Sequence, residues 1–317
     1  MAKYLDKAGL KTTLTALKSR FAALDVVSEL TEAVDGLLST VEALEKKVKD
    51  ARTDLLKVCG YTETEVMFAK ACDGVPTINV TNGDIRNMPP IDLSKCTYFS
   101  IRNSPVQIVH NLYLPLLESL STAFTNCTEL QSLPPIYAPN ARDMQMTFAG
   151  CSKLIRCPDL VLTTDPTGAS YISTARQAFK DCPLLIHVPE LNLRMATDLN
   201  GIFYGCGNLR RIESLKIGPV LADISNWFGI QDNLNPVFLN IEGIGISDSI
   251  TTWDFHYLRY WGQANDENRR SLVNSLITFS YDRTGNTRQT IRLSAEAKNL
   301  LTTAEIAQIT AKNYTLA

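Results

Sequence analysis

The sequence lacks several features that would assign the chain to a broad class. No stretch approaches the roughly 18 uninterrupted apolar residues of a transmembrane helix, so we expect none. Its charges nearly cancel, with 31 Lys and Arg against 33 Asp and Glu, which excludes a chain-wide basic field for nucleic acid. With 45% hydrophobic residues it is also too apolar for full disorder. At roughly 150 residues per domain, its 317 residues indicate about two folded units.

Signatures of catalysis and metal binding are also missing. The sequence has no GxSxG, Walker A, HExxH or GxGxxG pattern. Its three histidines, at His110, His187 and His256, lie far apart in sequence. The cysteines form no CxxC pair of the kind that binds zinc. We expect a protein that is not an enzyme, with no catalytic residue, cofactor or metal site.

The N-terminal segment has neither the apolar core nor the small-residue cleavage site of a secretory signal. We therefore expect a chain made in a reducing cytoplasm, with thiols that start reduced. An even count of eight cysteines would indicate disulfides only in an exported protein. The role of the cysteines must come from their positions.

Residues 7–24 are predicted to form a short amphipathic helix that Asp6 can cap. One face is apolar and the others carry Lys and Arg. One interpretation is packing on its own oligomer or on the next segment, and the other is a basic docking peptide that inserts into an acidic host surface. Membrane binding is less favoured, since this segment lacks Trp. The candidate anchor residues of the N-terminus are Lys3, Tyr4, Leu5, Lys7, Leu10, Lys11, Leu14, Leu17 and Phe21.

Residues 26–58 carry an apolar heptad pattern that predicts a parallel coiled-coil stalk. The register breaks from the preceding helix near Asp25, which can cap a new helix. Val at a with Leu at d favours a dimer. Val26 and Ala33 at g and Leu38 at e widen the stripe, so we expect a homotrimer, with a dimer as the alternative and packing on the chain's own globular domain as a third. The candidate oligomerisation residues are Val27, Leu30, Val34, Leu37, Val41, Leu44, Val48 and Leu55, with Ala51 and Val58 also in the stripe.

The middle of the chain repeats. Four segments align without gaps, each with Phe, then Cys three residues later and Leu six residues later. A fifth, degenerate copy follows at Phe228, where Gln231 replaces Cys and no Pro follows. The candidate repeat-core residues are Phe124, Cys127, Leu130, Phe148, Cys151, Leu154, Phe179, Cys182, Leu185, Phe203, Cys206, Leu209 and Phe228.

The period of about 24 residues lies in the range of leucine-rich repeats. One copy cannot bury its apolar face alone, so stacked copies should build a continuous core with a ladder each of Phe, Cys and Leu. Short runs after each Leu suit parallel strands. Cysteine fits such a ladder as a small apolar residue. The longer step between the second and third copies places a loop at residues 163–170, which includes Asp165, a candidate receptor contact.

These residues carry a resemblance to a known family. The units MTFAGCSKL and GIFYGCGNL, preceded by Asp and followed by a Leu-rich strand, resemble the BspA-like leucine-rich repeats of bacterial surface proteins and gut-phage proteins. The C-terminal segment from RRSLVNSL to KNYTLA is similar to the one that closes many such arrays. The opening MAKYLDKAGLKTTLTALKSRF resembles fibre-type virion proteins of phages of gut Bacteroides-like hosts. The resemblance implies surface recognition or adhesion rather than catalysis.

The segments on either side of the repeats are expected to cap them. Residues 59–120 show alternating apolar runs and turn signals, typical of strands and turns. Aromatic residues gather near the other end, within residues 253–261. They fit either a hydrophobic cap, which we favour, or a platform for host glycan. The candidate receptor contacts there are Trp253, Tyr257, Tyr260 and Trp261.

We therefore predict an α+β chain in five segments: an anchoring helix at 1–25, a coiled-coil stalk at 26–58, an N-terminal cap at 59–120, leucine-rich repeats at 121–245 and a C-terminal cap at 246–317. We expect a phage head- or tail-fibre subunit in the virion, bound to a capsid or tail protein through its N-terminus. Its partner outside is a host-surface glycan or protein, and no nucleic acid binding or membrane insertion is expected. The alternatives are a bacterial leucine-rich-repeat adhesin and a capsid decoration protein without a receptor.

Overall fold

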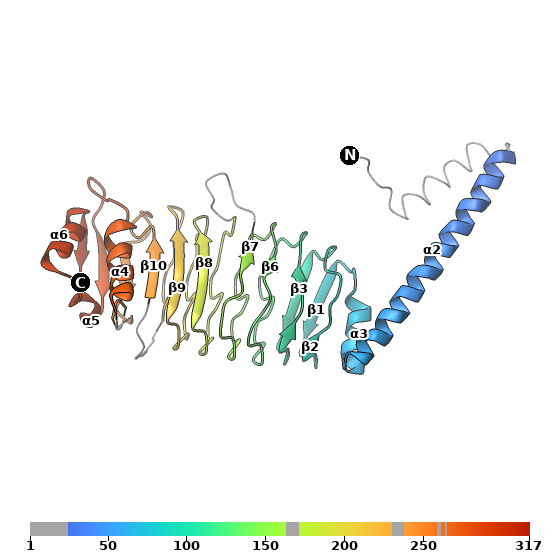
Figure 1. Cartoon of the computed structure of the whole chain (residues 1–317). Coiled ribbons are helices and arrows are strands. Elements are labelled where there is room, and N and C mark those ends of the chain that lie inside the picture. The colour runs from blue at the N-terminus through green and yellow to red at the C-terminus, as the bar shows by residue number, and fades with distance from the viewer. Residues whose placement is uncertain (1–24, 163–170, 230–237, 259–260, 264) are drawn as a thin grey trace. The chain divides into compact units, whose positions relative to one another are not determined.

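The computed structural model describes residues 25–162, 171–229, 238–258, 261–263 and 265–317. The chain divides into two compact units, Met1–Tyr61 and Thr62–Ala317. The protein is mixed α and β, with one long N-terminal helix and short parallel strands in small sheets. The N-terminal unit contains helix α2 (Asp25–Val58), which covers the heptad pattern (Figure 1).

The second unit begins with a helix that the sequence analysis did not predict, because residues 59–120 were expected to hold only strands and turns. Helix α3 (Glu63–Cys72) is started by a capping box. The Thr62 hydroxyl accepts a hydrogen bond from the Glu65 N–H at 3.3 Å, and a Glu65 carboxylate oxygen accepts from the Thr62 N–H at 2.9 Å. The T-x-x-E spacing in the sequence is the signal that would have predicted this helix.

The strands that follow are short and parallel. β1 (Thr77–Thr81) pairs with β3 (Tyr98–Arg102), and β2 (Asn87–Met88) pairs with β4 (Ile108–Val109). A three-stranded sheet contains β5 (Leu112–Tyr113), β6 (Ile136–Tyr137) and β7 (Leu160–Val161). In this sheet each residue pairs with the residue 24 positions later, such as Leu112 with Ile136 and Ile136 with Leu160. The sheet register therefore follows the sequence repeat.

Three longer parallel strands continue the pattern, namely β8 (His187–Leu193), β9 (Arg211–Ile217) and β10 (Phe238–Glu242). These strands stand side by side in Figure 1. Their buried side chains line up across the sheet, because Val188 pairs with Ile212 and Ile212 with Leu239. Charged and polar side chains alternate with them on the outer face. This alternation gives the sheet one apolar face toward the core and one polar face.

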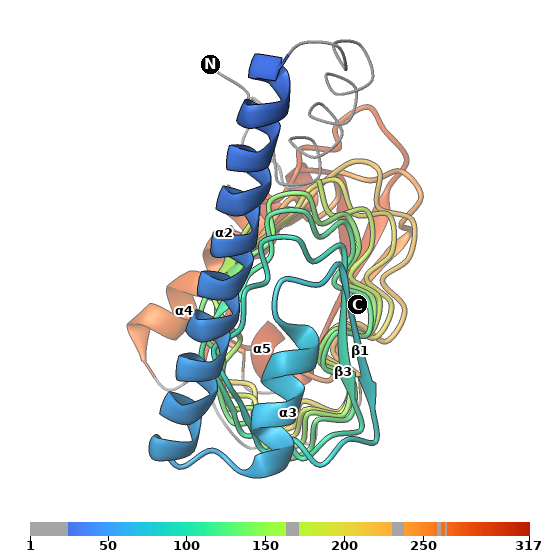
Figure 2. The same ribbon diagram turned by 90° about the vertical axis from the view of Figure 1, so that its right-hand side faces the viewer.

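A second row of main-chain hydrogen bonds joins the copies at the Phe positions. The Phe124 N–H donates to the Thr147 carbonyl at 2.8 Å, and the Phe148 N–H donates to the Ala178 carbonyl at 2.8 Å. The same bond recurs from Phe179 and from Phe203. Viewed along the row of strands, the successive turns of this unit overlie one another (Figure 2).

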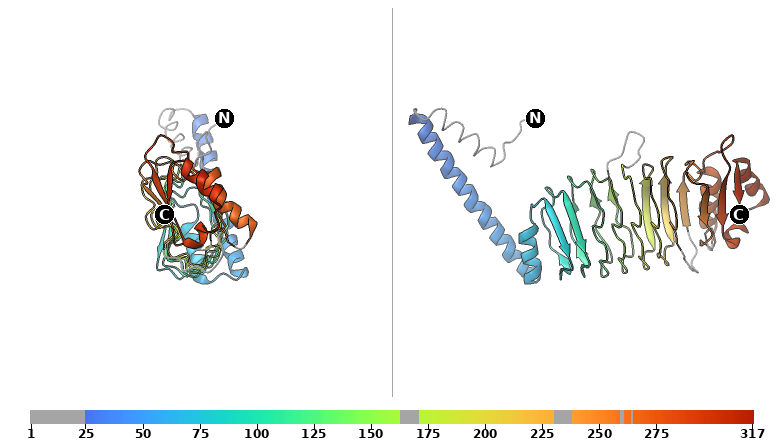
Figure 3. Two further views of the ribbon diagram at one scale, coloured as in Figure 1. Left: turned by 90° about the vertical axis from the view of Figure 1, so that its left-hand side faces the viewer. Right: turned by 180° about the vertical axis from the view of Figure 1, so that it is seen from behind.

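The C-terminal elements gather at the end of this unit (Figure 3). They are β11 (Thr252–Phe255), α4 (Asp266–Val273), the π-helix η1 (Asn274–Thr278), β12 (Gln289–Leu293), α5 (Ala295–Lys298), α6 (Thr303–Ala311) and β13 (Tyr314–Leu316). β12 lies between β11 and β13, and both pairings are parallel. The buried Arg283 donates to the Gly245 carbonyl at 2.7 Å and to the Asp248 carboxylate at 2.7 Å. These bonds join the start of the C-terminal segment to the loop that precedes β12.

Candidate functional site

The repeat-core residues form the interior of the second unit. All thirteen Phe, Cys and Leu side chains of the candidate set are buried. The Phe rings stack in one continuous row, with centroid distances of 5.9 Å from Phe124 to Phe148 and 5.3 Å from Phe148 to Phe179. The row continues at 5.6 Å to Phe203 and at 5.6 Å to Phe228. These residues therefore support the surface and do not contact a partner.

The cysteines have a role beyond small apolar volume. In the second, third and fourth copies the thiol donates to a main-chain carbonyl of the preceding copy: Cys151 to Phe124 at 3.0 Å, Cys182 to Phe148 at 3.1 Å and Cys206 to Phe179 at 3.0 Å. Burial raises the pKa of the Cys182 thiol to about 12, although a hydrogen bond involving Cys151 opposes the rise. The thiols therefore stay protonated and serve as donors that a purely apolar side chain would not supply.

The apolar stripe of α2, formed by its a and d side chains, lies at the surface, in contrast to the buried repeat core. Its a and d side chains are exposed, with 65% exposure at Leu37, 54% at Leu44 and 67% at Val48. Leu30, Val41, Leu55 and Val58 are exposed as well, and Val34 is half-buried. Leu38 is buried within the single chain, so it does not widen the exposed stripe as the sequence analysis expected.

Some predicted residues lie outside the described part of the chain. They are the anchor residues Lys3, Tyr4, Leu5, Lys7, Leu10, Lys11, Leu14, Leu17 and Phe21, and the candidate contacts Asp165 and Tyr260. Val27 belongs to α2, but its side chain is outside the described set. The loop at residues 163–170 is likewise outside it.

The aromatic cluster corrects one prediction, that Trp253 and Trp261 contact a receptor. Both indoles are 0% exposed and part of the core. The Trp253 Nε1 donates to Gln289 Oε1 at 2.8 Å, and the Trp261 Nε1 donates to the Leu239 carbonyl at 3.2 Å. Tyr257 is 37% exposed and remains available at the surface. Among its described residues, the sequence cluster therefore combines buried core residues with the exposed Tyr257.

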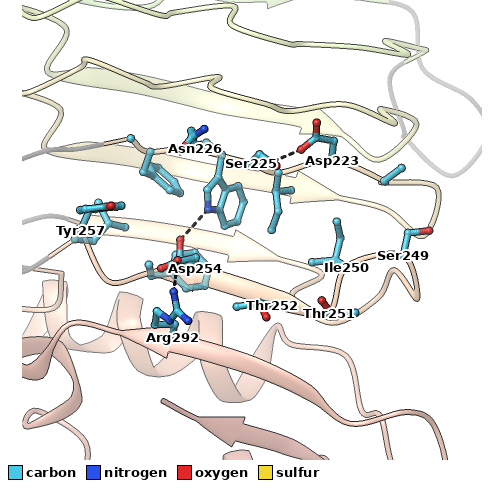
Figure 4. A pocket seen from close by; sticks show the side chains of 17 residues that line it. Asp223, Ser225, Asn226, Ser249, Ile250, Thr251, Thr252, Asp254, Tyr257 and Arg292 are labelled. Atoms are coloured by element: carbon cyan, nitrogen blue, oxygen red, sulfur yellow. Dashed lines mark hydrogen bonds and ion pairs between the residues drawn. The ribbon is translucent and has the colours of Figure 1, made fainter.

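A pocket of about 510 Å³ lies beside Tyr257, between the fifth repeat copy and β11. Its walls come from residues 222–229, from residues 249–252, 254, 255, 257 and 258, and from Arg292 of β12 (Figure 4). Trp227 and Phe228 are almost fully buried beneath it, and the Trp227 Nε1 donates to the Asp254 carbonyl at 3.0 Å. The fold thus supplies an apolar floor with polar groups around it, which is a common composition of ligand pockets.

Two carboxylates stand on opposite sides of this pocket. Asp223 accepts from the Ser225 N–H at 2.7 Å and from Asn200 Nδ2 at 3.4 Å. Burial raises the pKa of Asp223, but these hydrogen bonds outweigh it and hold the pKa below its usual value. Asp254 pairs with Arg292 Nη1 at 3.1 Å and also contacts the His256 ring. The sequence analysis missed this pocket, although the loss of the repeat pattern after Phe228 marked the place.

A charged network covers the outer face of β8 and β9. Glu213 accepts from Arg211 Nε at 2.6 Å and lies 3.1 Å from His187 Nε2. The hydrogen bond from Arg211 is the main cause that lowers the pKa of Glu213. The Arg211 guanidinium also lies 4.0 Å from the centre of the Phe238 ring. Because these side chains partner one another, they form a structural network and not an open site.

Within the described residues, no group of His, Cys, Asp and Glu side chains is arranged to hold a metal ion. Among these same residues, no helix is long and apolar enough to cross a membrane. Comparison of the chain with models of protein families, with curated proteins and with solved structures finds no match.

Proposed function

We propose that the chain is a subunit of a homo-oligomeric attachment fibre. Helix α2 joins three copies in a parallel coiled coil, and the second unit is a leucine-rich-repeat solenoid that presents a recognition surface. The fibre belongs to a phage virion, on the head or the tail, and contacts a host-surface glycan or protein.

The observation that carries this proposal is the exposed stripe of α2. The helix has 34 residues, which is a length of about 50 Å. Leu and Val occupy its a and d positions and are mostly exposed. Burial of such a side chain is worth about 1.5–3 kcal/mol, so the stripe is a strong driving force for association with further copies.

The number of chains in the coiled coil depends on the residues at and beside the stripe. Val at a with Leu at d favours two copies. Ala33 at a g position is exposed beside the stripe and widens it, which supports three. Three recognition surfaces on one stalk would convert weak single contacts into avid attachment.

The placement on a virion rests on the resemblance of the repeat units to BspA-like proteins and of the opening segment to phage fibre proteins. The described residues agree with a binding role, because they provide a rigid stack with a polar outer face and a pocket.

The mass of the intact chain in solution tests the stalk. We expect about three times the 35.1 kDa of one chain. The variant Leu37→Asp/Leu44→Asp should be monomeric, because two charges in the stripe cannot be buried. The matched control Ser39→Asp/Ala43→Asp adds the same charge at f and c positions and should keep the native mass. A monomeric native chain would contradict the proposal.

Binding of the labelled native chain to cells of gut Bacteroides strains tests recognition. We expect binding to some strains, and much weaker binding by the monomeric variant because avidity is lost. If no strain binds the native oligomer, the recognition role is wrong and a decoration protein becomes the better interpretation.

A further inference from the structure

The ladder of main-chain hydrogen bonds stops at the fifth repeat copy. In the first four copies, the N–H groups of Phe and of the residues two and four positions before it donate to carbonyls of the next copy. In the fourth copy, for example, Leu199 donates to Asp223, Gly201 to Ser225 and Phe203 to Trp227, at 2.7–2.9 Å. The equivalent N–H groups of the fifth copy belong to Ile224, Asn226 and Phe228. Within the described part of the chain they form no hydrogen bond.

The fifth copy nevertheless keeps the backbone conformation of the others. Asn226 has φ 54°, close to 53° at Met146 and 54° at Gln177, which are the equivalent residues. Asp223 also bridges Asp198 in the parallel arrangement of the earlier copies. The N–H groups of the fifth copy therefore point in the direction where a further copy would stack. Residues 249–258 stand there instead, across the pocket of about 510 Å³ (Figure 4).

This pocket has both donors and acceptors. The three residues with unbonded N–H groups all line it, and Asn226 adds an exposed side-chain amide. The carboxylates of Asp223 and Asp254 also line it. Each keeps an acceptor site beyond its hydrogen bonds, which for Asp254 include one from the His256 N–H at 3.1 Å. Tyr257 supplies a partly exposed ring at the rim.

We infer that the pocket binds a neutral saccharide. A sugar hydroxyl both accepts and donates a hydrogen bond, so adjacent hydroxyls can accept from the main-chain N–H groups and donate to the carboxylates. The ring of Tyr257 can cover an apolar sugar face, and the volume lies in the range of small-ligand pockets. The inference names the partner of the recognition surface and so rests on the proposed function.

The charges of the pocket favour a neutral sugar over an acidic one. Asp223 and Asp254 carry two negative charges, and Arg292 supplies one positive charge that Asp254 already partners at 3.1 Å. A carboxylated or sulfated sugar would bring a further negative charge between the two carboxylates, which is unfavourable.

The experiment applies the full-length chain to an array of neutral hexose and N-acetylhexosamine glycans together with sialylated and uronic-acid glycans. We expect binding to neutral glycans only. The variant Ser225→Trp, which fills the pocket from an exposed position, and Tyr257→Ala should each weaken binding about tenfold or more. The controls are Gln145→Trp, at the equivalent position of the second copy, and Tyr113→Ala, at another exposed tyrosine. Both should bind like the native chain.

Binding to acidic glycans alone, an absence of binding to any glycan, or unchanged binding by Ser225→Trp and Tyr257→Ala would each overturn the inference. Circular dichroism of both variants excludes unfolding as the cause of a loss, and Tyr257→Ala removes an exposed ring without adding bulk. The mass of the native chain in solution tests the proposed fibre independently of the glycan array. A trimer that ignores glycans leaves the fibre proposal standing and removes only the saccharide site.

Discussion

Two regions of this chain carry equally regular apolar patterns and place them in opposite environments. Leu37 of α2 is 65% exposed, whereas Phe179 of the repeats is 0% exposed. The difference lies in where the partner of each pattern is found. A seven-residue pattern along one helix needs another helix, whereas a pattern of about 24 residues brings the next copy of the same chain alongside. The repeat interior is therefore buried within one chain, whereas the described part of the chain leaves the stripe of α2 exposed.

The largest expected effect comes from breaking the Phe row. Phe179 lies between Phe148 at 5.3 Å and Phe203 at 5.6 Å. Phe179→Ala should lower the free energy of unfolding by about 3–5 kcal/mol, because it leaves a cavity in a stacked core. Denaturant titration measures this change. Leu184→Ala, an exposed leucine of the same copy, should change it by less than about 1 kcal/mol, and an equal loss in both variants would contradict the role of the row.

The thiol ladder should give a smaller effect. Cys151→Ala removes a buried sulfur and its 3.0 Å bond to the Phe124 carbonyl, at a cost of about 1–3 kcal/mol. Cys151→Ser keeps a donor at this position and should lose less than Ala. The same denaturant titration measures both variants. If Ser is the more destabilising, apolar volume and not hydrogen bonding determines the choice of cysteine.

Much of the mixed α and β arrangement could be predicted, because it depends on local periodicity. The long helix over the heptad pattern and the parallel strands after the repeat Leu residues follow from spacing alone. The set of Phe, Cys and Leu positions followed in the same way. By contrast, the aromatic cluster near residue 257 has no period, so nothing in the sequence distinguished the buried Trp253 from the exposed Tyr257.

The pocket and the thiol bonds could not be predicted for a different reason. Both depend on which groups of one copy meet the main chain of the next, and this depends on the stacking distance and the conformation of each turn. The N–H groups of Ile224, Asn226 and Phe228 can be identified as available donors only by comparison with the earlier copies, where the equivalent N–H groups are hydrogen-bonded. Helix α3 was missed although its capping box was visible, because the alternating runs around it favoured strands.

The hydrogen bond from the Asn87 N–H of β2 to the Glu65 carboxylate of α3 should make the free energy of unfolding depend on pH. Burial raises the pKa of Glu65, but hydrogen bonds from the Thr62 and Asn87 N–H groups outweigh it, so the pKa is lowered. A lowered pKa contributes stability that is fully present above the unfolded value of about 4.3 and is lost as the pH falls through the folded value.

Glu65→Gln should therefore reduce the free energy of unfolding by about 1 kcal/mol at pH 7, and the difference from the native chain should shrink below about pH 4. Denaturant titrations at several pH values measure this. The matched control Glu63→Gln, in the same turn but exposed, should change the free energy of unfolding at pH 7 by less than about 0.5 kcal/mol. A loss for Glu65→Gln that stays constant down to pH 3 would contradict the assignment.

The smallest effect on the second unit should come from the stripe of α2. Leu44→Ala removes a large apolar side chain, as Phe179→Ala does, but Leu44 is 54% exposed in the single chain. Its loss should leave the unfolding of the second unit within about 0.5 kcal/mol of the native value. If the chain forms the proposed oligomer, the same substitution should increase its dissociation on dilution, measured by sedimentation. If Leu44→Ala instead destabilises the second unit by several kcal/mol, the stripe is covered within one chain and the contrast between the two patterns fails.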